Sequence, residues 1–162
     1  MTAIITRESP LTDDLALLFQ RHHDHCHADT PPESIHMMDR ADLAVPEIAF
    51  FVARDDEGQP LAMGAVKVIE PGHGELKSMH VLAEARGLGL ARQMLDHLIA
   101  QARAMGLTRL SLETGAQASF TPARALYAAA GFAECGPFLG YRADLMSVFM
   151  TLDFTMPSND VN

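Results

Sequence analysis

Residues 86–91 read Arg86-Gly87-Leu88-Gly89-Leu90-Ala91. They follow an alternating, strand-like run at 75–81 and open a run at 88–105 whose apolar residues repeat at helical spacing. The first turn of a helix has backbone N–H groups without an internal partner, and glycine lets a ligand approach them closely. The stretch therefore predicts a phosphate site. The same glycines also fit a plain strand-to-helix turn that needs them only for its geometry.

Two nucleotide-binding motifs fit this turn poorly. A P-loop needs Gly-Lys-Ser/Thr, whereas leucine follows both glycines of the turn. A dinucleotide fingerprint needs Gly-x-Gly-x-x-Gly, and here Arg92 stands at its third glycine. The turn alone therefore does not identify the phosphate ligand.

Size and composition favour one globular domain over residues 1–162. The chain is 48% hydrophobic, which is enough for a real core, and its last residues, 155–162, form a short polar tail that we expect to fray. No apolar stretch approaches the roughly 18–20 residues that cross a bilayer, and the N-terminus lacks the pattern of a signal peptide. Cys26 and Cys135 lie far apart in the sequence and need not pair. We expect a cytoplasmic protein.

The net charge restricts the class of partner. At a formal charge of −9, broad binding to nucleic acid or to an anionic membrane is not expected, since both need a basic surface. Arg86 and Arg92 nevertheless bring positive charge to the glycine turn.

Alternation, helical spacing and turn residues predict a mixed α/β (α+β) sandwich around one sheet, largely antiparallel and flanked by helices. Thr12 is the expected N-cap of the first helix, whose apolar stripe is Leu15, Leu18 and Phe19. Residues 28–38 read as an irregular loop. Strands are expected at 3–7, 48–54, 61–69, 75–81, 109–113, 132–135 and 147–154. Helices are expected from about 13 and at 40–45, 88–105 and 122–130.

A second motif lies about 40 residues downstream and reads Ala123-Arg124-Ala125-Leu126-Tyr127-Ala128-Ala129-Ala130-Gly131-Phe132. In order and spacing with the glycine turn, it resembles the GNAT superfamily of acetyl-CoA-dependent N-acetyltransferases. The stretch Cys135-Gly136-Pro137-Phe138 before Tyr141 resembles a bacterial small-molecule branch of that family. That family carries a Gln/Arg-x-x-Gly-x-Gly/Ala turn after its fourth strand, and an Ala-x-x-Leu-Tyr-x-x-x-Gly-Phe segment after its fifth. Read from Glu84, the turn departs from the pattern at its first position. Phe120 stands where the family often has an asparagine.

The resemblance implies a site for acetyl-CoA. The pyrophosphate would be held by the backbone of Arg86, Gly87, Leu88, Gly89, Leu90 and Ala91. The pantetheine arm would pair with the edge of Met79, His80 and Val81, as an added strand does. The amide of Val81 would stabilise negative charge that develops on the thioester oxygen.

The resemblance also implies catalytic side chains. Tyr127 matches the family tyrosine that protonates the departing thiolate, with packing against the sheet as the alternative role and Tyr141 as the reserve candidate. Glu113 and Glu75 are the candidates for the base that takes the ammonium proton, either directly or through water. Lys77 would shift the pKa of such a carboxylate in a direction that depends on pairing.

Other polar residues are candidates for metal binding, acceptor binding or nucleophilic chemistry. The run from His22 to His27 places His22 and Cys26, and also His23 and His27, one helical turn apart. This is a metal pattern, but two ligands do not close a site, so we expect a polar helix end and no metal. His36 and Asp39 lie in the loop that covers the acceptor in this family. Cys135 has no obvious histidine partner for nucleophilic chemistry.

The sequence thus predicts direct acetyl transfer from acetyl-CoA to a primary amine of a small molecule or peptide, by a protein whose family often forms homodimers. A non-catalytic acyl-CoA-binding or sensor domain of the same fold is the alternative, and a metal-binding regulator is a third. The loop at 28–46 does not name the acceptor.

Overall fold

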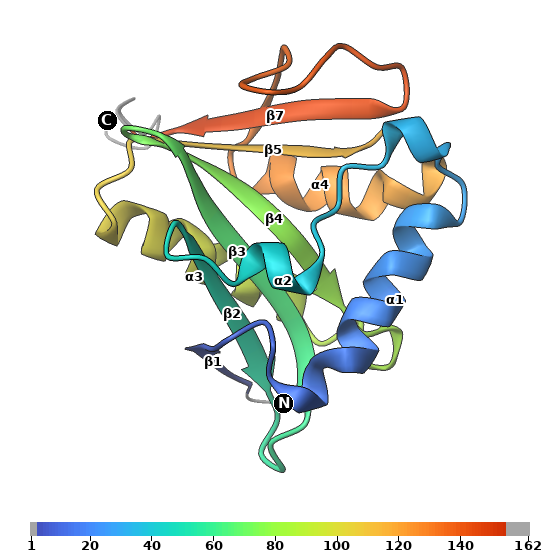
Figure 1. The fold of residues 1–162 in the computed structure, drawn as a ribbon, viewed down its shortest axis with the longest axis vertical. Coiled ribbons are helices and arrows are strands. Elements are labelled where there is room, and N and C mark those ends of the chain that lie inside the picture. The colour runs from blue at the N-terminus through green and yellow to red at the C-terminus, as the bar shows by residue number, and fades with distance from the viewer. Residues whose placement is uncertain (1–2, 155–162) are drawn as a thin grey trace.

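The structure, a computed structural model, describes residues 3–154, so the expected frayed tail lies outside the described residues. A seven-stranded sheet in the order β1-β2-β3-β4-β5-β7-β6 organises them (Figure 1). Its strands are β1 (Ile4–Arg7), β2 (Ile48–Arg54), β3 (Pro60–Glu70), β4 (His73–Val81), β5 (Arg109–Gly115), β6 (Ala133–Cys135) and β7 (Ser147–Asp153). Only β4 and β5 pair in parallel. The mixed, largely antiparallel sheet predicted from the sequence is confirmed.

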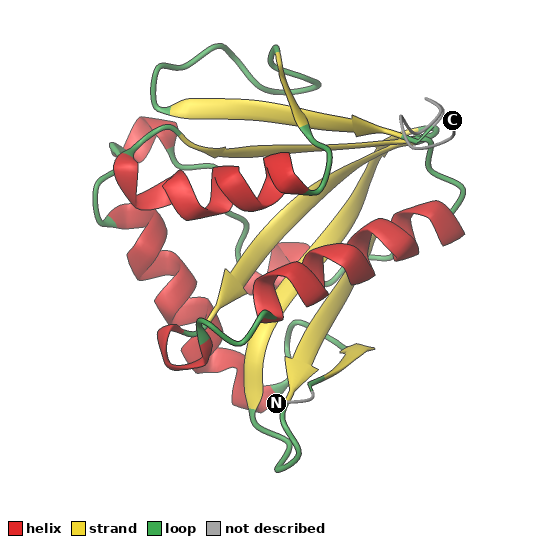
Figure 2. Ribbon diagram, turned by 180° about the vertical axis from the view of Figure 1, so that it is seen from behind, coloured by secondary structure: helices red, strands yellow, loops and turns green. Residues whose placement is uncertain are grey.

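The helices cover both faces of this sheet. They are α1 (Ala16–His27), α2 (Arg40–Leu43), α3 (Leu90–Ala104) and α4 (Thr121–Ala129), with one-turn 3-10 helices η1 (Asp13–Leu15), η2 (Pro32–Ser34), η3 (Ala83–Ala85) and η4 (Ala118–Phe120). In Figure 1, α1 and α2 lie in front of the sheet; from behind, in Figure 2, α3 and α4 lie in front. The fold is therefore a three-layer sandwich with one sheet in the middle.

Each face of the sheet has its own apolar core. Phe50 and Val52 of β2 pack with the predicted stripe of Leu15, Leu18 and Phe19. Their neighbours on β2, Ala49, Phe51 and Ala53, belong to the core on the other face, with residues of α3 and α4. Because successive residues of a strand point to opposite faces, a strand buried on both faces is apolar, as β2 is from Ile48 to Ala53.

Three local predictions need correction. Thr12 is the N-cap of η1, which precedes α1, but its side chain makes no capping hydrogen bond; its hydroxyl donates to the carbonyl oxygen of Ser9 at 2.8 Å. The loop at 28–38 contains η2. The helix expected from 88 begins at Leu90, because Gly87 and Gly89 have φ angles of 82° and 77°, which a right-handed helix excludes.

Two further observations bear on the expectations from composition. Cys26 and Cys135 are both free thiols. Within residues 3–154, no helix has the length and apolar character needed to span a membrane.

Candidate active site

The site begins where β4 and β5 separate. The two strands pair only over His73–Glu75 and Arg109–Ser111, and beyond these residues they diverge, as Figure 1 shows. A cavity of about 570 Å³ opens at this gap. Its walls come from α1, the loop that carries η2, β4, the turn before α3, β5 and α4. The sheet itself therefore leaves an opening between its two parallel strands.

A bulge in β4 shapes one wall of the cavity. Lys77 pairs with Ala65 on β3 and His80 pairs with Met63, so two residues of β4 lie opposite the single Gly64. Ser78, within the bulge, has a φ of 57°, which is uncommon for a residue other than glycine. A Cβ on Gly64 would lie 2.7 Å from Leu98 Cδ1 of α3, so glycine is what lets the helix approach the bulge.

The free edge of β4 faces the gap. The N–H of Leu82 donates to the carbonyl oxygen of Leu61, beside β3, at 2.9 Å. Because successive N–H groups of a strand point to opposite sides, the N–H of Val81 is directed away from β3 and toward the gap. Met79, His80 and Val81 all line the cavity, and their pairing with a pantetheine arm stays a prediction.

The turn before α3 forms the next wall. Gly89 is the N-cap of α3 in a left-handed conformation, and a Cβ on Gly87 or Gly89 would meet no atom within 4 Å. This space lies next to the free N–H groups of the first helical turn, where an anion is favoured. Of the six residues predicted for this turn, Arg86, Gly87, Gly89, Leu90 and Ala91 line the cavity. Leu88 does not, and 41% of it is exposed.

The apparent mismatch at Glu84 disappears in the structure. Glu84 lies in η3, ahead of the turn, and does not line the cavity. Arg86, Gly89 and Ala91 themselves satisfy Gln/Arg-x-x-Gly-x-Gly/Ala, with Gly89 at the helix N-cap where the pattern needs it. The departure at Glu84 therefore came from reading the motif two residues too early.

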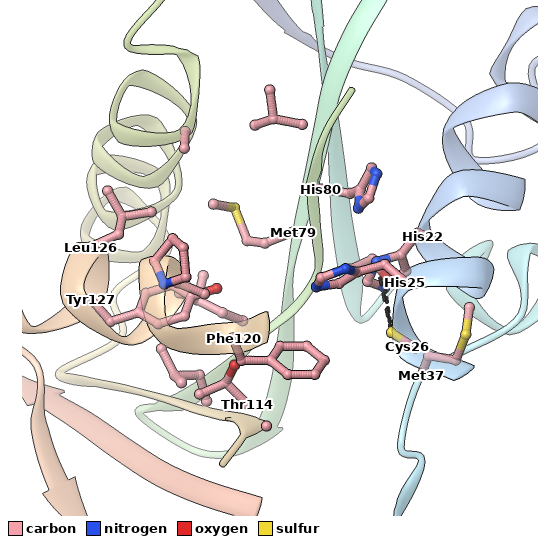
Figure 3. A pocket seen from close by; sticks show the side chains of 18 of the residues that line it. His22, His25, Cys26, Met37, Met79, His80, Thr114, Phe120, Leu126 and Tyr127 are labelled. Atoms are coloured by element: carbon pink, nitrogen blue, oxygen red, sulfur yellow. Dashed lines mark hydrogen bonds between the residues drawn. The ribbon is translucent and has the colours of Figure 1, made fainter. Parts of the chain in front are cut away.

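Phe120 replaces a polar group with an apolar wall. Its ring lies against Gly115, in the space that a Cβ there would need. On its other side, the ring centroid of His25 is 4.7 Å away (Figure 3). An aromatic ring cannot supply the hydrogen bond of an asparagine, so this part of the cavity binds by packing.

Tyr127 reaches the cavity from α4. It is 7% exposed, lines the cavity, and packs its ring edge-on against Phe132 with centroids 5.9 Å apart. Figure 3 shows it across the cavity from the histidines of α1. Burial, with the charge of Glu113, raises the pKa of the Tyr127 phenol above its ordinary value. The hydroxyl therefore holds its proton at neutral pH and is available as a donor.

Tyr141, the reserve candidate, is engaged elsewhere. Its hydroxyl donates to Glu75 Oε2 in a short hydrogen bond and accepts from Lys77 Nζ at 3.0 Å. Burial and the Glu75 carboxylate raise the pKa of the Tyr141 phenol. Tyr141 does not line the cavity, which leaves Tyr127 as the phenol that does.

The two candidate bases lie on the neighbouring strands β4 and β5 in different environments. Glu75 is 4% exposed and forms an ion pair with Lys77 at 3.2 Å. The pKa of Glu113 is raised to about 7, chiefly because burial disfavours the charged form. A hydrogen bond from Ser147 and the charge of Lys77 lower this pKa, and the charges of Glu75 and Asp144 raise it by less. A carboxylate that titrates near neutral pH is suited to general base chemistry.

A group of neutral imidazoles lines the cavity, and of these the sequence assigned only His80 to the site, for its backbone. His22 and His25 of α1 lie with ring centroids 5.3 Å and 6.2 Å from that of His80. Burial lowers the pKa of His22 to about 3 and that of His80 to about 4. The sulfur of Cys26 lies 3.9 Å from His22 Nε2, the contact drawn in Figure 3. Residues 3–154 hold no group of three or more His, Cys, Asp or Glu side chains placed to bind a metal.

The loop with η2 closes the end of the cavity opposite α3. His36, predicted to contact the acceptor, lines the cavity, and its carbonyl oxygen accepts from Lys77 Nζ at 3.2 Å. Ser34 donates to Asp144 at 2.6 Å and so ties this loop to the segment before β7. Asp39 and Cys135 do not line the cavity.

Comparison with known proteins relates this chain to N-acetyltransferases. Residues 12–132 match the acetyltransferase (GNAT) family. YsnE of Bacillus subtilis, an uncharacterized N-acetyltransferase, is 48% identical over 132 residues, which cover 79% of this chain and 86% of YsnE. The IAA acetyltransferase of Azospirillum brasilense is 41% identical over 147 residues, which cover 90% of this chain and 94% of that protein.

The fold is shared with solved structures. A Klebsiella pneumoniae protein assigned as an acyl-CoA N-acyltransferase superposes with a TM-score of 0.73 and 26% sequence identity, covering 94% of this chain and 98% of that one. Sequence and fold therefore lead to the same family.

Proposed function

Since the chain belongs to the acetyltransferase (GNAT) family, we propose that it is an N-acetyltransferase that uses acetyl-CoA as donor and a small-molecule primary amine as acceptor. The observation that carries this proposal is the cavity between the diverging strands β4 and β5. One end of the cavity meets the free amides of α3, and the buried phenol of Tyr127 and the buried carboxylate of Glu113 line it.

The chain offers a complete set of contacts to the donor. The first-turn amides of α3 and the Arg86 guanidinium suit the pyrophosphate. The edge of β4 over Met79, His80 and Val81, where the N–H of Val81 is free of β3, suits the amide groups of the pantetheine arm. When bound, acetyl-CoA supplies a thioester carbon that is open to attack by an amine.

Three groups of the chain then act on the reaction. Glu113 accepts a proton from the ammonium, directly or through a water, so that the nitrogen lone pair becomes free to attack. The N–H of Val81 donates to the thioester oxygen as negative charge builds on it. Tyr127 donates its proton to the sulfur as the carbon–sulfur bond breaks. The second proton that the nitrogen loses on becoming an amide passes to the Tyr127 oxygen, directly or through water, and restores the phenol. The acetyl group passes directly to the amine, and no residue of the chain is acylated.

Binding and transfer test the proposal separately. Calorimetry with purified protein is expected to show one acetyl-CoA per chain, and a free-thiol assay is expected to show amine-dependent release of coenzyme A. The acceptor panel contains simple amines, amino acids, polyamines, aminoglycosides and peptides. Absence of acetyl-CoA binding contradicts the donor assignment, and binding without transfer to any amine contradicts the acceptor assignment.

A further inference from the structure

We propose that the acceptor is an amine with an apolar body and no carboxylate beside the amino group, rather than an α-amino acid. The inference rests on the proposed function and deepens it. It concerns the acceptor end of the cavity, which we define by Ile35, Met37, Glu113, Phe120 and Met146. This end lies opposite the turn that opens α3.

An α-amino acid needs a cationic partner for its carboxylate, because burying an unpaired charge is costly. Lys77 is the lysine that lines the cavity near this end. Its ammonium group has three donors, and three oxygens already take them: Glu75 Oε2 at 3.2 Å, the His36 carbonyl at 3.2 Å and the Tyr141 hydroxyl at 3.0 Å. Lys77 is therefore occupied within the protein.

The remaining basic residues do not fill this role. Burial lowers the pKa of both His25 and His36 from the ordinary histidine value, so both rings are neutral at neutral pH. Arg86 and Arg92 line the cavity at the α3 turn, and Arg92 also pairs with Asp96 at 2.9 Å. Among the described residues that line the acceptor end, none offers an unpaired cation.

The charge that this end does carry has the opposite sign. Glu113 faces the cavity without a basic partner among the ion pairs of residues 3–154. Burial outweighs a hydrogen bond from Ser147 and the charge of Lys77, which lower its pKa, and the nearby carboxylates of Glu75 and Asp144 raise it further. An acceptor carboxylate here would meet repulsion, whereas an ammonium group would be attracted. The electrostatics therefore favour an acceptor whose only charge is its amine.

The walls indicate what the rest of the acceptor is like. Ile35, Met37, Phe120 and Met146 present aliphatic, thioether and aromatic surface to the cavity. Thioether side chains adapt to ligands of different shape, and burial of an apolar body contributes roughly 25 cal/mol per Å². An alkyl or arylalkyl amine matches these walls better than a polyhydroxylated amino sugar.

Matched pairs of acceptors test the inference: phenethylamine with phenylalanine, tyramine with tyrosine, and isopentylamine with leucine. Within each pair the side chain is the same and the carboxylate is present or absent. We expect kcat/KM, measured by thiol release at saturating acetyl-CoA, to be at least tenfold higher for each amine than for its amino acid. Equal or better use of the amino acids overturns the inference and leaves the proposed function intact.

Adding a cation to the acceptor end should reverse the preference. In Met146→Lys we expect the ratio of amine to amino acid kcat/KM to fall at least tenfold; Met37→Lys is the second variant if the first does not fold. Leu145→Lys adds the same charge at a neighbouring residue that is 96% exposed, and should keep the wild-type ratio. An unchanged ratio in folded cavity variants contradicts the inference.

The remaining outcomes separate the inference from the proposed function. Transfer to amino sugars or polyamines, with none to the apolar amines, overturns the inference alone. Transfer to peptides only overturns the inference and also the small-molecule acceptor of the proposed function. No transfer to any amine by a protein that binds acetyl-CoA overturns both.

Discussion

Arg21 Nη1 lies 2.8 Å from Glu84 Oε1, so an ion pair joins α1 to the short helix η3 that leads into the α3 turn. The side chains are 38% and 62% exposed. The carboxylate of Glu84 therefore pairs with Arg21 outside the cavity, next to the α3 turn and not within that turn. The positive charge of the phosphate end comes from Arg86, which lines the cavity.

This arrangement predicts opposite effects for two neighbouring substitutions. Arg86→Gln should raise the Kd of acetyl-CoA about tenfold and weaken its salt dependence, because a charge-assisted contact to phosphate is lost. Glu84→Gln should change the Kd less than about twofold, since exposed ion pairs contribute little. Calorimetry at two salt concentrations measures both. The assignment fails if Glu84→Gln has the larger effect.

Gly89 is predicted to be essential for acetyl-CoA binding. Its φ of 77° is costly for a β-branched residue, and a side chain there would enter the space beside the helix amides. Gly89→Val should raise the Kd more than tenfold. Gly58→Val is the matched control, because Gly58 has a φ of 80° and similar free space but lies in the β2–β3 hairpin. Equal loss of affinity in both variants would show that destabilisation, not the site, is responsible.

The pKa of Glu113 is expected to set the pH dependence of turnover. A base with a pKa of about 7 must be deprotonated to act, so kcat/KM should rise about tenfold per pH unit below pH 7 and level off above it. Glu113→Gln should lower kcat about a hundredfold and remove this acidic limb. Glu134→Gln, at an exposed residue of β6, removes one negative charge elsewhere and should keep the limb. A limb that persists in Glu113→Gln assigns the base to another group.

Removing the hydroxyl of Tyr127 should lower the catalytic rate, whereas removing that of Tyr141 should mainly lower the stability of the fold. Tyr127→Phe should lower kcat about a hundredfold while the Kd of acetyl-CoA stays within about twofold, because only the transferable proton is removed. Tyr141→Phe takes a hydrogen bond from Glu75, so its main effect should be a loss of about 1–3 kcal/mol in the free energy of unfolding. Denaturant unfolding and steady-state kinetics on both variants test this. A full rate in Tyr127→Phe would exclude it as the acid.

His22 should make the fold sensitive to acid. Its pKa is about 3 in the folded protein and about 6.5 in the unfolded chain, so between these values the unfolded chain binds the extra proton. The free energy of unfolding should therefore fall as the pH drops from 6.5 toward 3, by up to about 1.4 kcal/mol per pH unit from this residue. Urea unfolding of His22→Leu should show a shallower decline. His23→Leu, whose side chain is 53% exposed in the wild type, should not. Equal slopes in wild type and His22→Leu would contradict the assignment.

Local patterns were enough to predict most of the fold. The strand at β2 was predicted with the bounds that the structure has, because Ile48 to Ala53 form an unbroken apolar run that ends at Arg54. The turn at Gly87 and Gly89 was recognisable because these glycines precede a helix with a clear apolar stripe. The start of α3 was placed two residues early, since Leu88 fits the helical spacing although the φ of Gly89 prevents a helix there.

The side-chain contacts around the candidate site could not be predicted from the sequence. The ring of His22 faces that of His80 from another element, and Lys77 meets Tyr141 across 64 positions of the chain. No spacing rule links such pairs, because helix and strand periodicity extend over a few residues only. The length of β4 that pairs with β5, and therefore the gap between them, also depends on how the strands twist and pack.

The sequence by itself determined the order of strands and helices, the glycine turn and the family motifs, because each depends on residues close together in the chain. Tertiary structure alone decided that Glu84 pairs with Arg21, that Lys77 is saturated by Glu75, His36 and Tyr141, and that Glu113 is left without a basic partner among the ion pairs of residues 3–154. Burial and the distances between charges set the protonation and availability of these groups, and both quantities exist only once distant segments have packed together.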